Sequence, residues 1–183
     1  MIERGRQRAA CISRGKEGAR RRPGYGAARI VMKWLNHEVV TGVIVYTATN
    51  DVLCSIYAMA GAVIPDKLEG NPGTGSAYWR WRSRHRGWSH WPMIYIAVGG
   101  TLHEYMAAGE EALWQTPAVI GFYLMVGALL HIAEDAVCGE VPLLRPDRKA
   151  GLKLFKVGSV AEYLFALAVV LLCYCLHAGL GGG

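Results

Sequence analysis

The stretch PAVIGFYLMVGALLHIAED, residues 117–135, decides the fold of this chain. It is almost continuously apolar as far as His131, and it then ends in two carboxylates, Glu134 and Asp135. A helix rises about 1.5 Å per residue and needs roughly 20 residues to cross about 30 Å of hydrocarbon. With its flanks, the stretch is long enough to do so. We therefore expect a membrane helix with ionisable side chains at one end.

Three further apolar blocks cover residues 39–64, 91–102 and 160–176, and the first is interrupted by Asn50-Asp51. The hydrophobic fraction, 52% of 183 residues, is high for a soluble protein. These patterns predict an all-α, multi-pass helical integral membrane bundle. Its parts would be a helical hairpin that turns near Asn50-Asp51 and about three further membrane helices.

Charge placement predicts which ends of these helices face the cytoplasm. The loops at 67–86 and 145–156 are rich in Arg and Lys, whereas 103–114 carries only acidic charge. Short cytoplasmic loops are enriched in Lys and Arg. Both basic loops are therefore expected on the cytoplasmic side, together with the polar residues that end each apolar block.

The first 31 residues differ from the rest. Residues 1–33 hold ten Lys or Arg against Glu3 and Glu17, so much of the net charge of +6 is local. We expect residues 1–31 to be a basic, disordered extension, or an artefact if translation begins at Met32, and residues 32–183 to be the helical membrane domain. Nucleic acid is not expected as a partner.

Six polar residues are predicted to meet at the cytoplasmic end and to hold a divalent metal, with zinc the expected ion. Neutral imidazole nitrogen and carboxylate oxygen are good ligands for such ions. A plain surface pair at a helix end, and an interfacial belt of tryptophans around HRGWSH at 85–90, are the alternatives. The predicted ligands are His37, Asp66, His85, His90, His131 and Asp135.

Three neighbours of these ligands receive other roles. Glu134 is interpreted as a group that supports the ligands or as a general base. Arg86 either binds a substrate phosphate or is an ordinary cytoplasmic-side cation. Ser89 is expected to cap the helix that begins near Trp91-Pro92.

These motifs, in this order, resemble the YdjM-like inner-membrane proteins, also described as LexA-binding, inner membrane-associated hydrolases or predicted membrane-bound metal-dependent hydrolases. The resemblance runs from Met32 to about Pro146 through Asn36-His37, GAVIPD at 61–66, HRGWSH at 85–90, the His131–Asp135 pair and PLLRP at 142–146. It implies a multi-pass protein of the bacterial inner membrane, distantly similar to the zinc-dependent phospholipase C fold. The same six ligand residues are the matching positions.

One position departs from the family pattern. Members commonly carry a second acidic residue two after the Pro-Asp, where this chain has Leu68, with Glu69 displaced by one. If that carboxylate bridges metals, this chain holds fewer ions or has weaker activity.

The expected function is a membrane-bound, metal-dependent hydrolase that uses metal-activated water on a phosphoester, such as a phospholipid headgroup, at the cytoplasmic face. Two alternatives stay open. One is a non-catalytic membrane scaffold that binds a cytoplasmic regulatory protein. The other is a small transporter component that uses Asp51 and Glu162.

Overall fold

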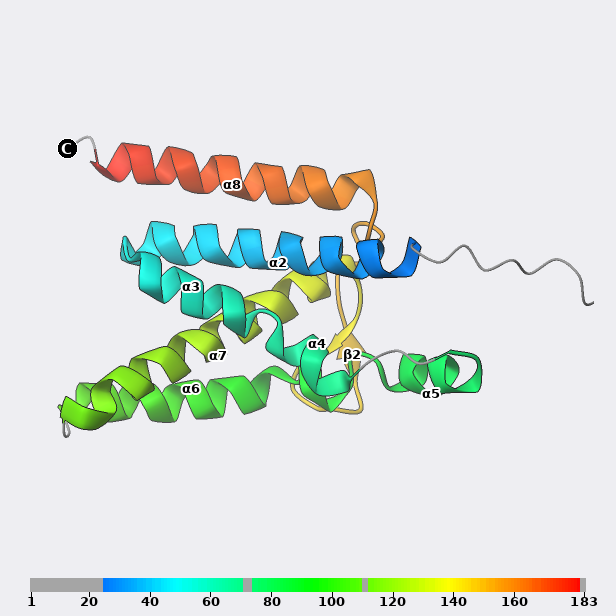
Figure 1. Cartoon of the computed structure of the whole chain (residues 1–183), viewed down its shortest axis with the longest axis horizontal. Coiled ribbons are helices and arrows are strands. Elements are labelled where there is room, and N and C mark those ends of the chain that lie inside the picture. The colour runs from blue at the N-terminus through cyan, green and yellow to red at the C-terminus, as the bar shows by residue number, and fades with distance from the viewer. Residues whose placement is uncertain (1–24, 71–73, 110–111, 182–183) are drawn as a thin grey trace, which may run out of the picture. The chain divides into compact units, whose positions relative to one another are not determined.

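The computed structural model describes residues 25–70, 74–109 and 112–181, and most of them form helices (Figure 1). The residues from Val31 onward make one compact unit. The predicted extension lies outside the described residues except for Tyr25 to Val31, which are helical. The elements are α2 (Tyr25–Thr49), α3 (Val52–Gly61), α4 (Ile64–Glu69), α5 (Ser76–Arg84), η2 (Trp88–His90), α6 (Pro92–Ala107), α7 (Ala112–Cys138), β1 (Val141–Pro142), β2 (Lys149–Ala150) and α8 (Val160–Gly181).

Helices α2 and α3 form a hairpin whose turn lies at Asn50 and Asp51. Asn50 takes a left-handed backbone conformation, with φ of 52°, which Asn tolerates better than most residues. The Asp51 carboxylate then caps α3 by accepting hydrogen bonds from Leu53 N at 2.7 Å and Cys54 N at 3.1 Å. The break inside the first apolar block is therefore a helix end followed directly by a helix start.

Helix α7 lies between α3 and α6, and glycine brings it close to α3. A Cβ atom on Gly127 would lie 1.8 Å from Ala58 O, and one on Gly61 would lie 2.1 Å from Leu124 O. The two backbones therefore approach at distances that a side chain would prevent. On the other side of α7, Tyr95 of α6 packs with Ala128 and Ile132. These contacts fix the end of α7 that carries the polar residues.

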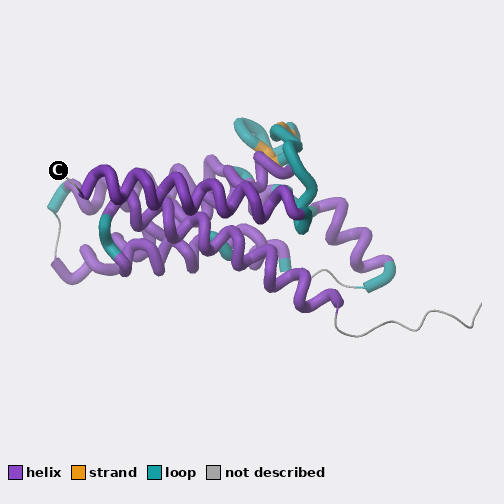
Figure 2. The backbone as a smooth tube through the Cα atoms, turned by 90° about the horizontal axis from the view of Figure 1, so that it is seen from above, coloured by secondary structure: helices purple, strands orange, loops and turns teal. Residues whose placement is uncertain are grey.

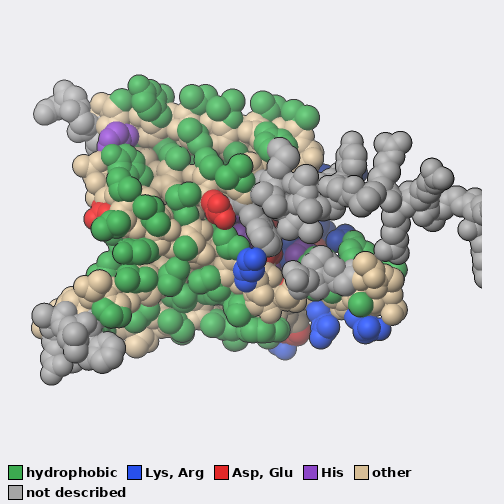
Figure 3. All heavy atoms as spheres, viewed as in Figure 1, with side chains coloured by type: hydrophobic (Ala, Val, Ile, Leu, Met, Phe, Trp, Pro, Cys, Tyr) green, Lys and Arg blue, Asp and Glu red, His purple; other side chains and the backbone are tan. Residues whose placement is uncertain are grey.

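Helix α8 runs alongside α2 in the same direction. Asn36 Nδ2 donates to Glu162 Oε1 at 3.0 Å near one end, and the rings of Tyr46 and His177 lie 5.4 Å apart near the other. Most of the apolar surface of α8 is nevertheless uncovered, as Figure 3 shows for one face. Two described helical segments are long and apolar enough to cross a membrane: Gln115–Cys138, 28% buried, and Val160–Gly179, 11% buried.

Residues 140–159, called the strap below, connect α7 to α8 and carry the two-stranded sheet, which projects from the helices in Figure 2. The strap also closes the end of α7. Leu152 N donates to Ala136 O at 2.7 Å, and Leu154 N donates to Val137 O at 2.9 Å. These bonds satisfy carbonyls that have no partner inside the helix.

Candidate metal centre

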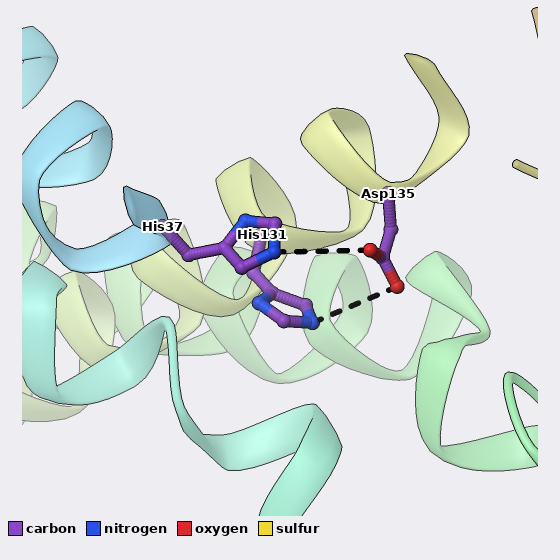
Figure 4. A group of neighbouring side chains, drawn as sticks. All are labelled: His37, His131 and Asp135. Carbon is purple, nitrogen blue, oxygen red and sulfur yellow. Dashed lines mark ion pairs between the residues drawn. The ribbon is translucent and has the colours of Figure 1, made fainter. Parts of the chain in front are cut away.

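Five of the six predicted ligands meet around Asp135. Its two oxygens lie near a nitrogen of each of three histidines: 3.8 Å from His37 Nε2, 3.4 Å from His90 Nε2 and 3.8 Å from His131 Nε2. Figure 4 shows His37, reaching in from α2, beside His131 and Asp135 of α7. Asp66 of α4 completes the cluster, with Oδ1 3.5 Å from His90 Nε2. Residues 98 positions apart in sequence numbering, His37 and Asp135, thus share one site.

These side chains form two overlapping groups of metal-ligating atoms. The atoms of His37, His131 and Asp135 lie within 4.8 Å of one another, and so do those of Asp66, His90 and His131. The separations around Asp135, 3.4 to 3.8 Å, are small enough for one ion with bonds of about 2 Å to reach both atoms of a pair. The set contains the mixture of imidazole and carboxylate that zinc-like ions prefer.

Two of the histidines contact a carboxylate through Nδ1, the ring nitrogen that does not face Asp135. His37 Nδ1 lies 2.9 Å from Glu134 Oε2, and His90 Nδ1 lies 2.9 Å from Glu69 Oε1. When Nδ1 carries the proton and donates it to the carboxylate, Nε2 is left with its lone pair facing Asp135. Metal-ligating histidines commonly have such a partner, which fixes the tautomer and the ring orientation.

Glu69 is the centre of a second set of contacts. Besides His90, it meets His85 Nδ1 at 2.5 Å and accepts hydrogen bonds from Arg86 N at 2.6 Å and Ser89 Oγ at 2.8 Å. Burial alone would raise the pKa of this carboxyl, but His85, His90 and Ser89 outweigh it and hold the pKa well below its usual range. Glu69 is thus an anion that fixes the whole HRGWSH turn.

Among the described residues, no carboxylate forms such a hydrogen bond with His131. Both of its ring nitrogens are buried and make no hydrogen bond within the described residues, and Nε2 of His90 is in the same condition. The His131 side chain is only 1% exposed. A buried imidazole nitrogen without a partner costs free energy, and coordination to a cation would remove that cost. This is the observation on which the fit of a metal rests.

His85 lies at the edge of the cluster. Its ring stacks on Trp81, with centroids 4.4 Å apart, and 25% of its side chain is exposed. A third group of ligating atoms, from Asp66, Glu69 and His85, also lies within 4.8 Å. In that group, however, Glu69 already bonds four partners. The structure therefore places His85 beside the five central residues and not among them.

Arg86 enters the site through a left-handed backbone conformation, with φ of 55°. Its Nη2 donates to Asp135 Oδ1 at 2.7 Å, and its Nε is buried without a partner in the described chain. Gly139 makes room for the guanidinium, since a Cβ there would lie 2.0 Å from Nη1. A cation therefore lies against the ligand carboxylate.

The protonation of His90 reflects the acidic groups around it. Burial alone would lower the pKa of His90, but Asp135, Asp66 and Glu69 outweigh it and raise the pKa to about 10. For Asp66, burial raises the pKa, and the facing His90 and His131 more than reverse this, so that the net direction is downward. In the metal-free protein, the proton on His90 supplies positive charge that offsets these carboxylates. A bound metal ion would supply that charge instead.

Two residues of the site have roles that differ from those predicted from the sequence. Ser89 does not cap α6, whose N-cap is Trp91 without a side-chain bond; the Ser89 hydroxyl bonds Glu69 instead. Glu69 was interpreted only as a displaced acid. Its spacing of three from Asp66 was the available signal, since two such residues share a face once residues 64–69 are helical.

Comparisons of the chain with protein-family models, with curated proteins and with solved structures find no match.

Proposed function

We propose that this protein is a membrane-bound, metal-dependent hydrolase of the YdjM-like kind, acting on a phosphoester at the cytoplasmic face. The proposal rests chiefly on His131, a buried histidine whose two ring nitrogens make no hydrogen bond among the described residues, although it lies beside two carboxylates, Asp66 and Asp135. The order of the motifs along the chain supports the family assignment.

The ion would be held by His37, Asp66, His90, His131 and Asp135. When bound, a zinc-like ion supplies a water of lowered pKa and a positive charge for the ester oxygen. His37 and His90 are kept in the ligating orientation by Glu134 and Glu69. Glu134 thereby gains a positioning role, and its second oxygen, Oε1, is buried without a partner in the described chain and can hold a proton.

Arg86 is the residue that we assign to the anionic part of the substrate. Its Nη2 is bonded to Asp135, which orients the guanidinium, and Nε remains to donate to a phosphoryl oxygen. Exposed basic residues surround the same end of the molecule and would favour a negatively charged substrate. They include Arg80, Arg82, Arg84, Arg148 and Lys149.

The membrane assignment rests on exposed apolar surface. In α8, Val160, Leu164, Leu167 and Leu171 lie on one face, and each is more than half exposed. A helix that is apolar all round and covered on one side only suits lipid better than water. On the face in Figure 3 the Lys and Arg side chains gather toward the end with α4 and α5, as expected for a cytoplasmic surface.

Metal analysis of detergent-purified protein tests the proposal. Wild type should carry stoichiometric zinc-like metal, and the His90→Ala/His131→Ala double variant should carry none. The matched control is His103→Ala/His177→Ala, which removes two histidines outside the cluster and should keep wild-type metal content. Hydrolysis of phospholipid vesicles should follow the metal, ceasing with a chelator and returning with added zinc.

Absence of stoichiometric metal in the wild type would reject the hydrolase. If His131→Ala then left the biological function intact, a non-catalytic membrane scaffold that binds a cytoplasmic regulator would replace it. Metal without hydrolysis of any phosphoester would instead reject the substrate class.

A further inference from the structure

The strap exposes leucines and cations together. Leu144, Leu152 and Leu154 are 79%, 67% and 66% exposed, although leucine is ordinarily among the more buried residues. Five basic residues are exposed in the same twenty-residue segment, against two acidic ones, Glu140 and Asp147. The basic residues are Arg145, Arg148, Lys149, Lys153 and Lys156.

The ion pairs within the strap leave part of this charge uncompensated. Arg145 pairs with Asp147 at 3.0 Å and Lys153 pairs with Glu140 at 2.5 Å, which uses both acidic groups. Lys149 donates to His85 O at 2.9 Å. The strap therefore carries a net charge of +3, five basic minus two acidic residues, with Arg148 and Lys156 outside its ion pairs.

The position of the strap follows from α8. Val160, 75% exposed, begins α8 directly after the strap, and its uncovered apolar face continues through Leu164 and Leu167. If α8 crosses the bilayer, the strap lies at the level where hydrocarbon gives way to headgroups. Exposed apolar side chains among cations suit that layer, because leucine reaches the acyl region and Lys or Arg meets phosphate.

We propose that the strap is a docking surface for anionic phospholipid headgroups, which it holds beside the metal centre. This inference depends on the membrane placement in the proposed function, but not on hydrolysis. Charge complementarity and the continuity of the strap with the apolar face of α8 favour lipid over a protein partner. Because Lys149 bonds the His85 carbonyl and Leu152 closes the end of α7, a docked lipid lies against elements of the site itself.

Hydrogen exchange of the full chain in nanodiscs tests the inference. The two compositions are phosphatidylcholine alone and phosphatidylcholine with phosphatidylglycerol. Exchange of strap amides should be slower by about fivefold or more in the anionic discs, the factor expected for holding one cation at an anionic surface. The difference should shrink at high salt.

Two double variants sharpen the test. Arg148→Glu/Lys156→Glu should abolish the difference between the two compositions, and Arg148→Lys/Lys156→Arg, which keeps the charge, should retain it. Both pairs are exposed, so folding is preserved. Equal strap exchange in both compositions, with α8 amides protected in both, would overturn the docking surface alone. Unprotected α8 amides would overturn the membrane placement as well.

A further outcome would assign the surface to protein. Strap protection in detergent that rises with protein concentration would mean that a second copy of this chain covers the strap, and it would overturn the lipid assignment.

Discussion

Helices α7 and α8 are both long and apolar, yet they are used differently. In α7, close contacts at Gly127 and the polar end at His131 and Asp135 tie the helix into its neighbours. In α8, only 11% of the apolar segment Val160–Gly179 is buried. Composition alone therefore does not separate a helix that carries polar side chains into a cluster from one that leaves its apolar surface exposed. The positions of glycine and of ionisable residues do.

A charge in the middle of α8 should have the largest effect. Leu171→Asp puts a carboxylate on a residue that is 54% exposed, and such a charge near the centre of a membrane helix opposes insertion by about 3 to 4 kcal/mol relative to leucine. Glycosylation mapping of membrane insertion should show the inserted fraction fall. Leu171→Ile should insert like wild type, and unchanged insertion of the Asp variant would mean that α8 does not meet lipid.

Adding a methyl group at the α3–α7 contact should have the second-largest effect. Gly127→Ala places a Cβ 1.8 Å from Ala58 O, so the backbones must separate, at about 2 to 3 kcal/mol of unfolding free energy. Thermal unfolding in detergent measures this. Gly100→Ala in α6, where nothing lies within 4 Å, should instead leave the stability unchanged or raise it by up to about 1 kcal/mol. Similar losses in both variants would contradict the close packing.

Removing the support of His90 should weaken the site without removing a ligand. Glu69→Gln takes the negative charge from the carboxyl that holds His90 Nδ1, and loss of such a partner lowers metal affinity about 10- to 100-fold. Competitive metal titration measures the change. Glu104→Gln alters an exposed acid and should have no effect. Equal affinity of Glu69→Gln and wild type would show that Glu69 does not support the ligand.

A change of one pH unit should alter metal affinity by less than the Glu69→Gln substitution. The pKa of His90 is raised to about 10 without metal, so at pH 7 this ligand must lose a proton when the ion binds. Apparent affinity should therefore rise with pH, by up to about tenfold per unit between about pH 7 and 9. A flat titration in that range would mean that His90 is already neutral in the metal-free protein.

The metal-free protein should show the opposite trend. Because the folded-state pKa of His90 lies above its ordinary value of 6.5, its contribution to stability is fully present below about pH 6.5 and is lost as pH rises toward about 10. Thermal unfolding of chelator-treated protein across this range measures the loss. A melting temperature independent of pH would contradict the raised pKa.

Much of the fold follows from local sequence signals. The break at Asn50-Asp51 predicted the hairpin because Asn accepts the left-handed turn and Asp caps the next helix, and α3 does begin at Val52. The all-α class was likewise predicted from the apolar blocks. The meeting of His37 with Asp135 could be anticipated because each borders an apolar block at the same expected depth, although His37 lies in the middle of α2 and the role of both residues as ligands stays a prediction.

The finer arrangement depends on contacts that no local pattern carries. His85 and His90 belong to one motif, yet the left-handed turn at Arg86 sends His90 inward and leaves His85 against Trp81. The role of Glu69 depends on the short helix α4, and its contacts come from residues sixteen to twenty-one positions later, His85 to His90. Such long-range contacts are set by packing, which spacing alone does not show.

The end of α7 has a consequence for how an ion would be captured. The aligned peptide dipoles of a helix leave a partial negative charge of about half an elementary unit at its C-terminus, and α7 ends at Cys138, one turn beyond Glu134 and Asp135. The negative end of the helix dipole and the two carboxylates therefore lie close together. They repel one another in the folded protein. A cation bound here would lower this electrostatic potential beyond what Arg86 already does, so ion binding is expected to stabilise the end of α7 as well as fill the site.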